Sequence, residues 1–234
     1  MCVEYLMDLR SYYQNREIIS ILRKHGVKIS ESILSRYLRG RMMPSIDKSL
    51  AILQAFKSEN VLRETLEKIL VVDRDGIINI PYIAFSLPVL RMASCHAWLK
   101  YRDKNIEHVL TAAVNGIPLS TLVAEKLNAQ LAVAKQSLDA GITRYLETKY
   151  IAPNPPRYQT LYIPYYALKP QSNVLIVDDL LFSGRTLGAL IGLAKKIHAN
   201  IKGVFSLIAM GDNWRIYLKD CPNAEVHIIL EKNI

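Results

Sequence analysis

Hydrophobic residues in the first third of the chain recur at the spacing of α-helices, and no segment there reads as a strand. Helices are expected over residues 1–13, 15–25 and 31–39, and in a segment that opens at Pro44 and Ser45. Gly26 ends the second helix, because glycine tolerates the left-handed conformation found there. Ser30 or Ser32 caps the third. The pattern predicts an all-α N-terminal region.

Strands and helices alternate in the rest of the chain. Strands are expected at 108–114, 130–134, 173–178, 201–209 and 225–231, and helices at 84–101, 117–127 and 186–198. This alternation is typical of an α/β fold with a mostly parallel sheet covered on both faces. A turn-like break follows Val71. We therefore expect two domains, 1–72 and 73–234.

Composition narrows the class of protein. The 234 residues carry a net charge of +9, which favours a polyanionic partner. No apolar run approaches the roughly 20 residues of a membrane span, and Glu4 and Asp8 interrupt the first apolar stretch, so no signal peptide is expected. The three cysteines have no metal-ligand spacing. We expect a cytoplasmic protein with buried thiols and no membrane contact.

One segment carries most of the chemical information: a run of apolar residues from Asn173 leads into Asp178 and Asp179, followed by a turn of small residues and a helix. Such a run predicts a strand buried on both faces, whose carboxyl end is where open α/β sheets bind ligands. Ser183 and the residues after it can present N–H groups and hydroxyls to a phosphate at a helix N-terminus. The two aspartates suit vicinal hydroxyls or a bridging Mg²⁺. The combination indicates a phosphorylated ribose, and an ordinary buried strand with a capped turn is the alternative.

The string Val-Leu-Ile-Val-Asp-Asp-Leu-Leu-x-Ser-Gly-x-Thr, over residues 174–186, resembles the phosphoribosyl pyrophosphate (PRPP) motif of type I phosphoribosyltransferases. The resemblance implies that fold for the second domain and the binding of PRPP together with Mg²⁺, which Asp178 and Asp179 would hold through the ligand. It assigns PRPP binding to Asp178, Asp179, Ser183, Gly184, Arg185, Thr186 and Leu187. Arg185 stands where many of these enzymes have glycine, so positive φ is less accessible there.

A second turn, at the end of the expected strand 108–114, has the same character. Asn115 and Gly116 open the next helix and can present N–H groups to an anion. The turn resembles the pyrophosphate loop of the same family, where a non-proline cis peptide is common. The resemblance assigns this loop to Val114, Asn115 and Gly116, with Lys135 at the end of the next strand. The alternative is that Lys135 is a solvated residue at the end of a strand, with no ligand.

Residues 137–172 are rich in tyrosine and broken by prolines from Pro153 to Pro156. They match the position of the family's long mobile loop, and dimer contacts are the alternative.

Trp214, after the last core strand, could stack on a nucleobase or cover a core edge. The resemblance assigns no catalytic residue.

The third expected helix resembles the recognition helix of lambda-repressor-like DNA-binding domains in the segment Leu34–Gly40. Its inward side would be Ile33, Leu34, Tyr37 and Leu38. Its outward residues and nearby cations are assigned to DNA contact: Ser32, Ser35, Arg36, Arg39, Arg41 and Lys48. The turn before it is about two residues longer than in those repressors. Residues 16–57 hold nine Lys or Arg against three Asp or Glu, which favours phosphate contact; a solvated basic face is the alternative.

The combination resembles archaeal regulators that fuse a helix-turn-helix to a phosphoribosyltransferase-like domain. It implies a transcriptional regulator that senses PRPP or a related nucleotide, binds double-stranded DNA and works as a homodimer. Two alternatives stay open: an active purine or orotate phosphoribosyltransferase with a helical extension, and an RNA-binding attenuator.

Overall fold

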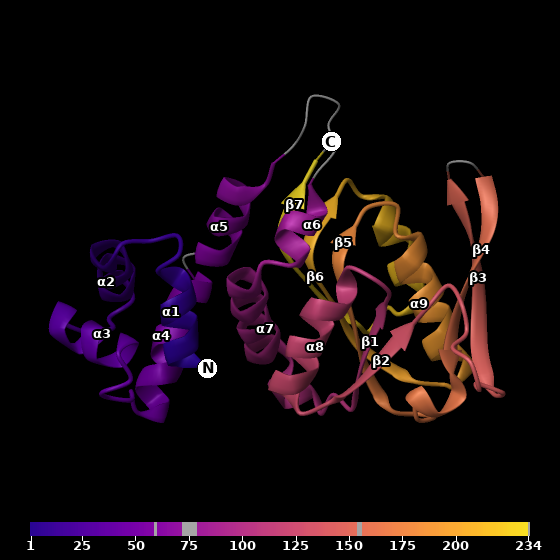
Figure 1. The fold of residues 1–234 in the computed structure, drawn as a ribbon, viewed down its shortest axis with the longest axis horizontal. Coiled ribbons are helices and arrows are strands. Elements are labelled where there is room, and N and C mark those ends of the chain that lie inside the picture. Colours follow the sequence, from indigo (N-terminus) through magenta and orange to yellow (C-terminus); the bar gives the residue numbers. More distant parts are fainter. Residues whose placement is uncertain (59, 72–78, 154–155, 234) are drawn as a thin grey trace. The chain divides into compact units, whose positions relative to one another are not determined.

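The computed structural model describes all residues except 59, 72–78, 154–155 and 234, and it divides into two compact units, Met1–His96 and Ala97–Ile234 (Figure 1). The expected domain boundary near residue 72 lies outside the described residues. The compact units part later in the chain, between His96 and Ala97.

The first unit is all-α, as the helical spacing predicted. Its helices are α1 (Cys2–Leu9), α2 (Asn15–Lys24), α3 (Glu31–Leu38), α4 (Ile46–Ser58), α5 (Val61–Ile69), α6 (Ile80–Ala84) and the first part of α7 (Leu87–Tyr101). Its core contains Leu22, Leu34 and Phe56, which have no exposed surface. The ring of Tyr5 stacks on Phe56 at 5.6 Å between centroids.

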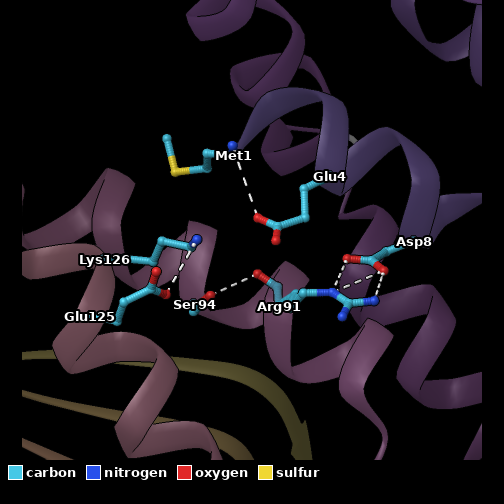
Figure 2. A network of polar contacts seen from close by, with 7 residues as sticks. All are labelled: Met1, Glu4, Asp8, Arg91, Ser94, Glu125 and Lys126. Atoms are coloured by element: carbon cyan, nitrogen blue, oxygen red, sulfur yellow. Dashed lines mark hydrogen bonds and ion pairs between the residues drawn. The ribbon is translucent and has the colours of Figure 1, made fainter. Parts of the chain in front are cut away.

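Polar contacts explain why the first part of α7 belongs to this unit. The Arg91 guanidinium donates to both carboxylate oxygens of Asp8, at 2.9 Å from Nε and 2.5 Å from Nη2 (Figure 2). Asp8 is buried in α1, so this ion pair compensates a charge that would otherwise be costly to bury. Tyr5 Oη and His96 Nε2 form a hydrogen bond of 3.1 Å. The helix after the expected boundary is therefore tied to the first helix of the chain.

The second unit contains a five-stranded parallel sheet with the order β2-β1-β5-β6-β7. The strands are β1 (His108–Ala112), β2 (Gln130–Ala134), β5 (Asn173–Leu181), β6 (Asn200–Met210) and β7 (Glu225–Lys232), with helices α8 (Gly116–Leu127) and α9 (Arg185–Lys196) between them. All strand pairs in this sheet are parallel, as expected. The central strand β5 is almost fully buried, which agrees with its continuous apolar run.

The segment 137–172, expected as a long loop, contains an antiparallel hairpin of β3 (Tyr145–Pro153) and β4 (Pro156–Pro164). Leu161 and Ile163 on β4 are fully buried, and Leu146 and Tyr150 on β3 pack against the same core. The expectation of a loop was wrong, because alternate residues of both strands bury an apolar face.

Trp214 is fully buried in η3 (Asn213–Asp220), and its Nε1 donates to Gly211 O at 2.9 Å. It therefore covers the core and is not placed for stacking on a base.

Among the described residues, every helix is too short or too polar to cross a bilayer.

Candidate functional site

Two adjacent carboxylates lie at the carboxyl end of the central strand. Asp178 and Asp179 are 7% and 8% exposed, and the Asp179 N–H donates to Asp178 Oδ1 at 3.0 Å. β5 is flanked by β1 and β6: its pairing with β1 covers Val174–Ile176, and its pairing with β6 continues past Asp178 to Leu181. The predicted buried parallel strand is confirmed, and it continues beyond the aspartates to Leu181.

The environment of this pair disfavours two negative charges. Burial raises the pKa of Asp178 well above the ordinary aspartate value, and the charge of Asp179 adds to the effect. Burial also raises the pKa of Asp179. A pair of this kind gains from a cation or from hydroxyl donors, because either one offsets the repulsion and the lost hydration.

The turn after β5 leads into α9 through Gly184, where a larger residue would clash. Gly184 is the N-cap of α9 and has a φ of +73°, and a Cβ at this position would lie 2.4 Å from the Trp214 Cα. Arg185 is the first helical residue, and its φ is not positive. The stiffening expected from Arg185 is therefore absent, since Gly184 supplies the left-handed residue.

The predicted side chains of this turn differ in accessibility. Ser183, Arg185 and Thr186 are half-buried. The Leu187 side chain is 1% exposed and packs in the core, so it is not available to a ligand. Within the described part of the chain, Arg185 Nη1 is buried without a hydrogen-bond partner.

The loop after β1 meets the aspartate pair. A Cβ on Gly116 would lie 2.5 Å from Thr111 Oγ1 and 2.9 Å from Asp178 Oδ1, so only glycine lets this loop approach so closely. The peptide bond between Ala113 and Val114 is cis, the geometry that the resemblance implied. Val114 is 68% exposed. The two predicted loops thus lie together at one end of the sheet.

Sequence reasoning missed Thr111. This residue is fully buried on β1, and its hydroxyl has no hydrogen-bond partner among the described residues. It lies beside Gly116, within reach of the region that Asp178 occupies. The signal was its position near the carboxyl end of a strand that neighbours β5, since parallel strands end at the same edge of a sheet.

Lys135 and Tyr150 complete the surroundings. Lys135 follows β2, and its Nζ pairs with Asp139 at 2.8 Å, so its charge is partly engaged. Tyr150 on β3 lies beside Thr186. Burial raises the pKa of the Tyr150 hydroxyl. The hairpin therefore touches the predicted phosphate turn, which the sequence did not indicate.

The N-terminal candidate surface is built on α3. Ser30 caps it, with its Oγ accepting from Ile33 N–H at 3.3 Å, as predicted. Leu34 and Tyr37 are buried, whereas Ile33 and Leu38 are half-buried. The residues assigned to DNA divide by accessibility: Ser32, Arg36, Arg39 and Arg41 are exposed, and Ser35 and Lys48 are half-buried. Lys48 Nζ donates to Lys28 O at 3.1 Å, beside the turn before α3.

The sheet, its helices and the placement of the two loops define a type I phosphoribosyltransferase-like fold, preceded by a helical unit. Solved structures agree: adenine phosphoribosyltransferase from Rhodothermus marinus superposes with a TM-score of 0.62 at 20% identity, covering 74% of this chain and 99% of the enzyme. The enzyme from Saccharomyces cerevisiae gives 0.62 at 16% identity, covering 73% and 99%. No model of a known protein family matches the chain.

Sequence relatives include both regulators and enzymes. The purine biosynthesis transcriptional repressor PurR of Bacillus subtilis is 29% identical over 108 residues, which are 46% of this chain and 38% of the repressor. The chain thus spans less than two fifths of that relative's length. Xanthine phosphoribosyltransferase of Alkaliphilus metalliredigens is 22% identical over 156 residues, covering 64% of this chain and 77% of the enzyme.

Proposed function

We propose that this protein is a DNA-binding transcriptional regulator that senses PRPP, or a related phosphoribosyl ligand, through its phosphoribosyltransferase-like unit. The observation that carries the proposal is the meeting of three features at one sheet end: the buried Asp178–Asp179 pair, the turn at Gly184 and the loop at Gly116. Similarity to purine repressors supports a regulatory role for such a fold.

Each part of the site has a distinct task in this proposal. Asp178 and Asp179 accept hydrogen bonds from the ribose hydroxyls, and the backbone and hydroxyls of the Ser183–Thr186 turn hold the 5-phosphate at the start of α9. The loop ending at Gly116 holds the pyrophosphate. The buried, unpartnered hydroxyl of Thr111 fits a polar ligand group at this end of the sheet.

The residues also fit Mg²⁺, which is bound in proteins by one or two carboxylates together with substrate phosphates. Asp178 and Asp179 are two such carboxylates, and burial makes a cation favourable beside them. Within the described residues, no cluster of three acidic, histidine or cysteine side chains forms a separate metal centre. When bound, Mg²⁺ would neutralise charge on the phosphates and orient them.

DNA binding is assigned to the exposed residues of α3. Arg36 and Arg39 are exposed on this helix or at its end, and Arg41 follows directly. Arginine recognises guanine and phosphate through paired hydrogen bonds, which suits a helix placed in the major groove. Helix-turn-helix proteins commonly bind as dimers to palindromic sites, so we propose a homodimer on double-stranded DNA.

A gel shift on the region upstream of the protein's own gene tests the proposal. We expect binding that exceeds binding to random duplex at moderate salt, and a change of affinity when PRPP and Mg²⁺ are added together. The double variant Asp178→Asn/Asp179→Asn is the matched control: it should bind DNA but not respond to PRPP. Equal binding of both duplexes would contradict the regulator.

An active transferase is the second candidate, favoured by the match to 77% of a xanthine phosphoribosyltransferase. We expect no turnover, since the sequence offers no identifiable catalytic acid, base or base-gripping hood, and Trp214, one candidate for stacking on a base, is buried in the core. The protein is mixed with PRPP, Mg²⁺ and each common purine, pyrimidine or orotate, and pyrophosphate release is followed. Robust release with any one base would place the enzyme above the regulator.

A further inference from the structure

Arg185 occupies the first helical position of α9, where a cation is unfavourable. The N-terminus of a helix carries a partial positive charge, and α9 has no acidic residue in its first turn. The two lysines of α9 lie in its last turn, where the helix dipole favours them. Arg185 therefore adds a full positive charge to the end of the helix that is already positive.

The Arg185 side chain also lacks the partners that a half-buried guanidinium needs. Its Nη1 is buried and has no hydrogen-bond partner among the described residues, and the same part of the chain offers it no ion pair. A buried donor without a partner has lost its hydration and gained nothing in return. A bound anion would offset both costs, the one at the helix end and the one at Nη1.

The helical period places Arg185 under the β3–β4 hairpin. Residues two and three turns apart lie on one side of a helix, so Arg185 shares a side of α9 with Gly192 and Lys196. β3 runs beside this side of the helix (Figure 1). Lys196 Nζ donates to Glu147 O at 2.6 Å. A Cβ on Gly192 would lie 3.2 Å from Thr148 Oγ1, so the two elements are in close contact.

The same side of the hairpin brings a second cation toward the start of α9. Tyr150 lies beside Thr186, the residue that follows Arg185. Gln159 is directly opposite Tyr150, and Arg157 lies two residues further toward the tip, on the same side of the hairpin. Burial raises the pKa of the Tyr150 hydroxyl, and the positive charge of Arg157 partly offsets this rise, so the two groups are near each other.

We propose that the Arg185 guanidinium binds the phosphate of a sugar phosphate at the start of α9, with Arg157 as a second contact from the hairpin. The inference rests on the proposed function and narrows its ligand to one that carries a phosphate monoester. Arginine suits this task, because its guanidinium donates paired hydrogen bonds to phosphate. The glycine that many related enzymes have at this position offers no side chain for such a contact.

Calorimetric titration of the full chain with ribose 5-phosphate and, separately, with PRPP and Mg²⁺ tests the proposal. Arg185→Gln should weaken the binding of both ligands roughly tenfold to a hundredfold, the loss expected for one charge-assisted hydrogen bond. Arg185→Lys keeps the charge without the paired donors and should bind with intermediate affinity. Arg157→Gln should weaken binding about twofold to fivefold, because the exposed Arg157 charge is screened by water.

The stability of the ligand-free protein separates this role from packing alone. In urea unfolding, Arg185→Gln should leave the midpoint unchanged or raise it, because the variant removes a cation from a helix N-terminus. A side chain that only packed its apolar stem under the hairpin would lower the midpoint when replaced. The matched control is Lys195→Gln, at the other end of α9, where Lys195 pairs with Asp220. It should lower the midpoint slightly and leave ligand binding unchanged.

The outcomes distinguish this inference from the proposed function. If Arg185→Gln binds both ligands as tightly as the unaltered protein does, the inference falls and the proposed function stands. A lowered urea midpoint with unchanged affinity would assign Arg185 to packing and also overturn the inference. If the unaltered protein binds neither ligand, both the inference and the proposed function are wrong.

Discussion

Asp178 and Asp179 place two carboxylates where less than a tenth of either residue touches water. Without a ligand, burial and mutual repulsion raise the pKa of Asp178 well above its usual value. A group with a raised pKa in the folded state stabilises the fold at low pH and loses that contribution as pH rises. The ionised form of both carboxylates becomes favourable once a cation or hydroxyl donors are present. The ionised pair therefore favours ligand binding but lowers the stability of the ligand-free fold.

The double variant Asp178→Asn/Asp179→Asn separates these effects. We expect PRPP binding to weaken by several kcal/mol, at roughly 1.5–3 kcal/mol for each charge-assisted hydrogen bond lost, measured by calorimetry with Mg²⁺. In ligand-free protein, the variant should gain stability relative to the unaltered chain as pH rises from 3.8, the ordinary aspartate pKa, toward the raised values. Urea unfolding at several pH values measures this. Tight PRPP binding by the variant would remove the ligand assignment.

Gly116→Ala tests the close approach of the two loops. The added Cβ would meet Thr111 Oγ1 at 2.5 Å and Asp178 Oδ1 at 2.9 Å, so the loop must shift. We expect a stability loss of about 1–3 kcal/mol, as for other overpacked sites, and weaker PRPP binding. Gly192→Ala in α9 is the control, because its new Cβ would meet only Thr148 Oγ1, at 3.2 Å. Unchanged PRPP affinity in Gly116→Ala would contradict the role of this loop.

At the scale of elements, periodicity located α1 to α4, α7 and the strands of the sheet, whereas α5 and α6 were not predicted. The apolar run of β5 and the helical spacing of α2 leave little choice of structure, because one face or both must be buried. The hairpin was missed because its prolines and polar residues suggested a loop. Two runs rich in Tyr, Ile and Thr on either side of a proline-containing break were the available signal.

Contacts between distant residues were less predictable than elements. That Gly116 abuts Asp178 depends on how β1 and β5 pair, and the burial of Trp214 depends on the path of η3 over α9 and the sheet. Spacing along the chain does not contain this information. The aspartate pair was predictable, since both residues follow one buried strand and belong to one motif.

The exposed part of α3 should discriminate between DNA sequences. Arg36→Ala is expected to relax sequence preference, since a bidentate contact to guanine contributes about 1–3 kcal/mol of discrimination. Arg41→Ala should weaken all sites alike and reduce the salt slope by about 0.9. Titrations of specific and random duplexes at several salt concentrations measure both. Arg63→Ala, an exposed arginine on α5 paired with Glu67, is the control. If Arg36→Ala behaves like Arg63→Ala, α3 does not read bases.

At the scale of the whole molecule, the chain divides into two compact units, and the proposed ligands bind to different units. A regulator needs a free energy of coupling between them. Thermodynamic linkage makes such coupling reciprocal: if PRPP changes DNA affinity by some factor, DNA changes PRPP affinity by the same factor. Linkage is independent of the structural route and of whether PRPP raises or lowers DNA affinity.

The last prediction follows from this reciprocity. DNA affinity is measured with and without saturating PRPP and Mg²⁺, and PRPP affinity with and without saturating operator duplex. We expect equal ratios of about 5–150, the range of 1–3 kcal/mol of coupling. In Asp178→Asn/Asp179→Asn the DNA ratio should fall to one, because the ligand no longer binds, while DNA affinity itself is kept. Arg36→Ala should keep PRPP affinity in the absence of DNA. A ratio of one in the unaltered protein, with both ligands bound tightly, would mean that the second unit binds PRPP without controlling DNA.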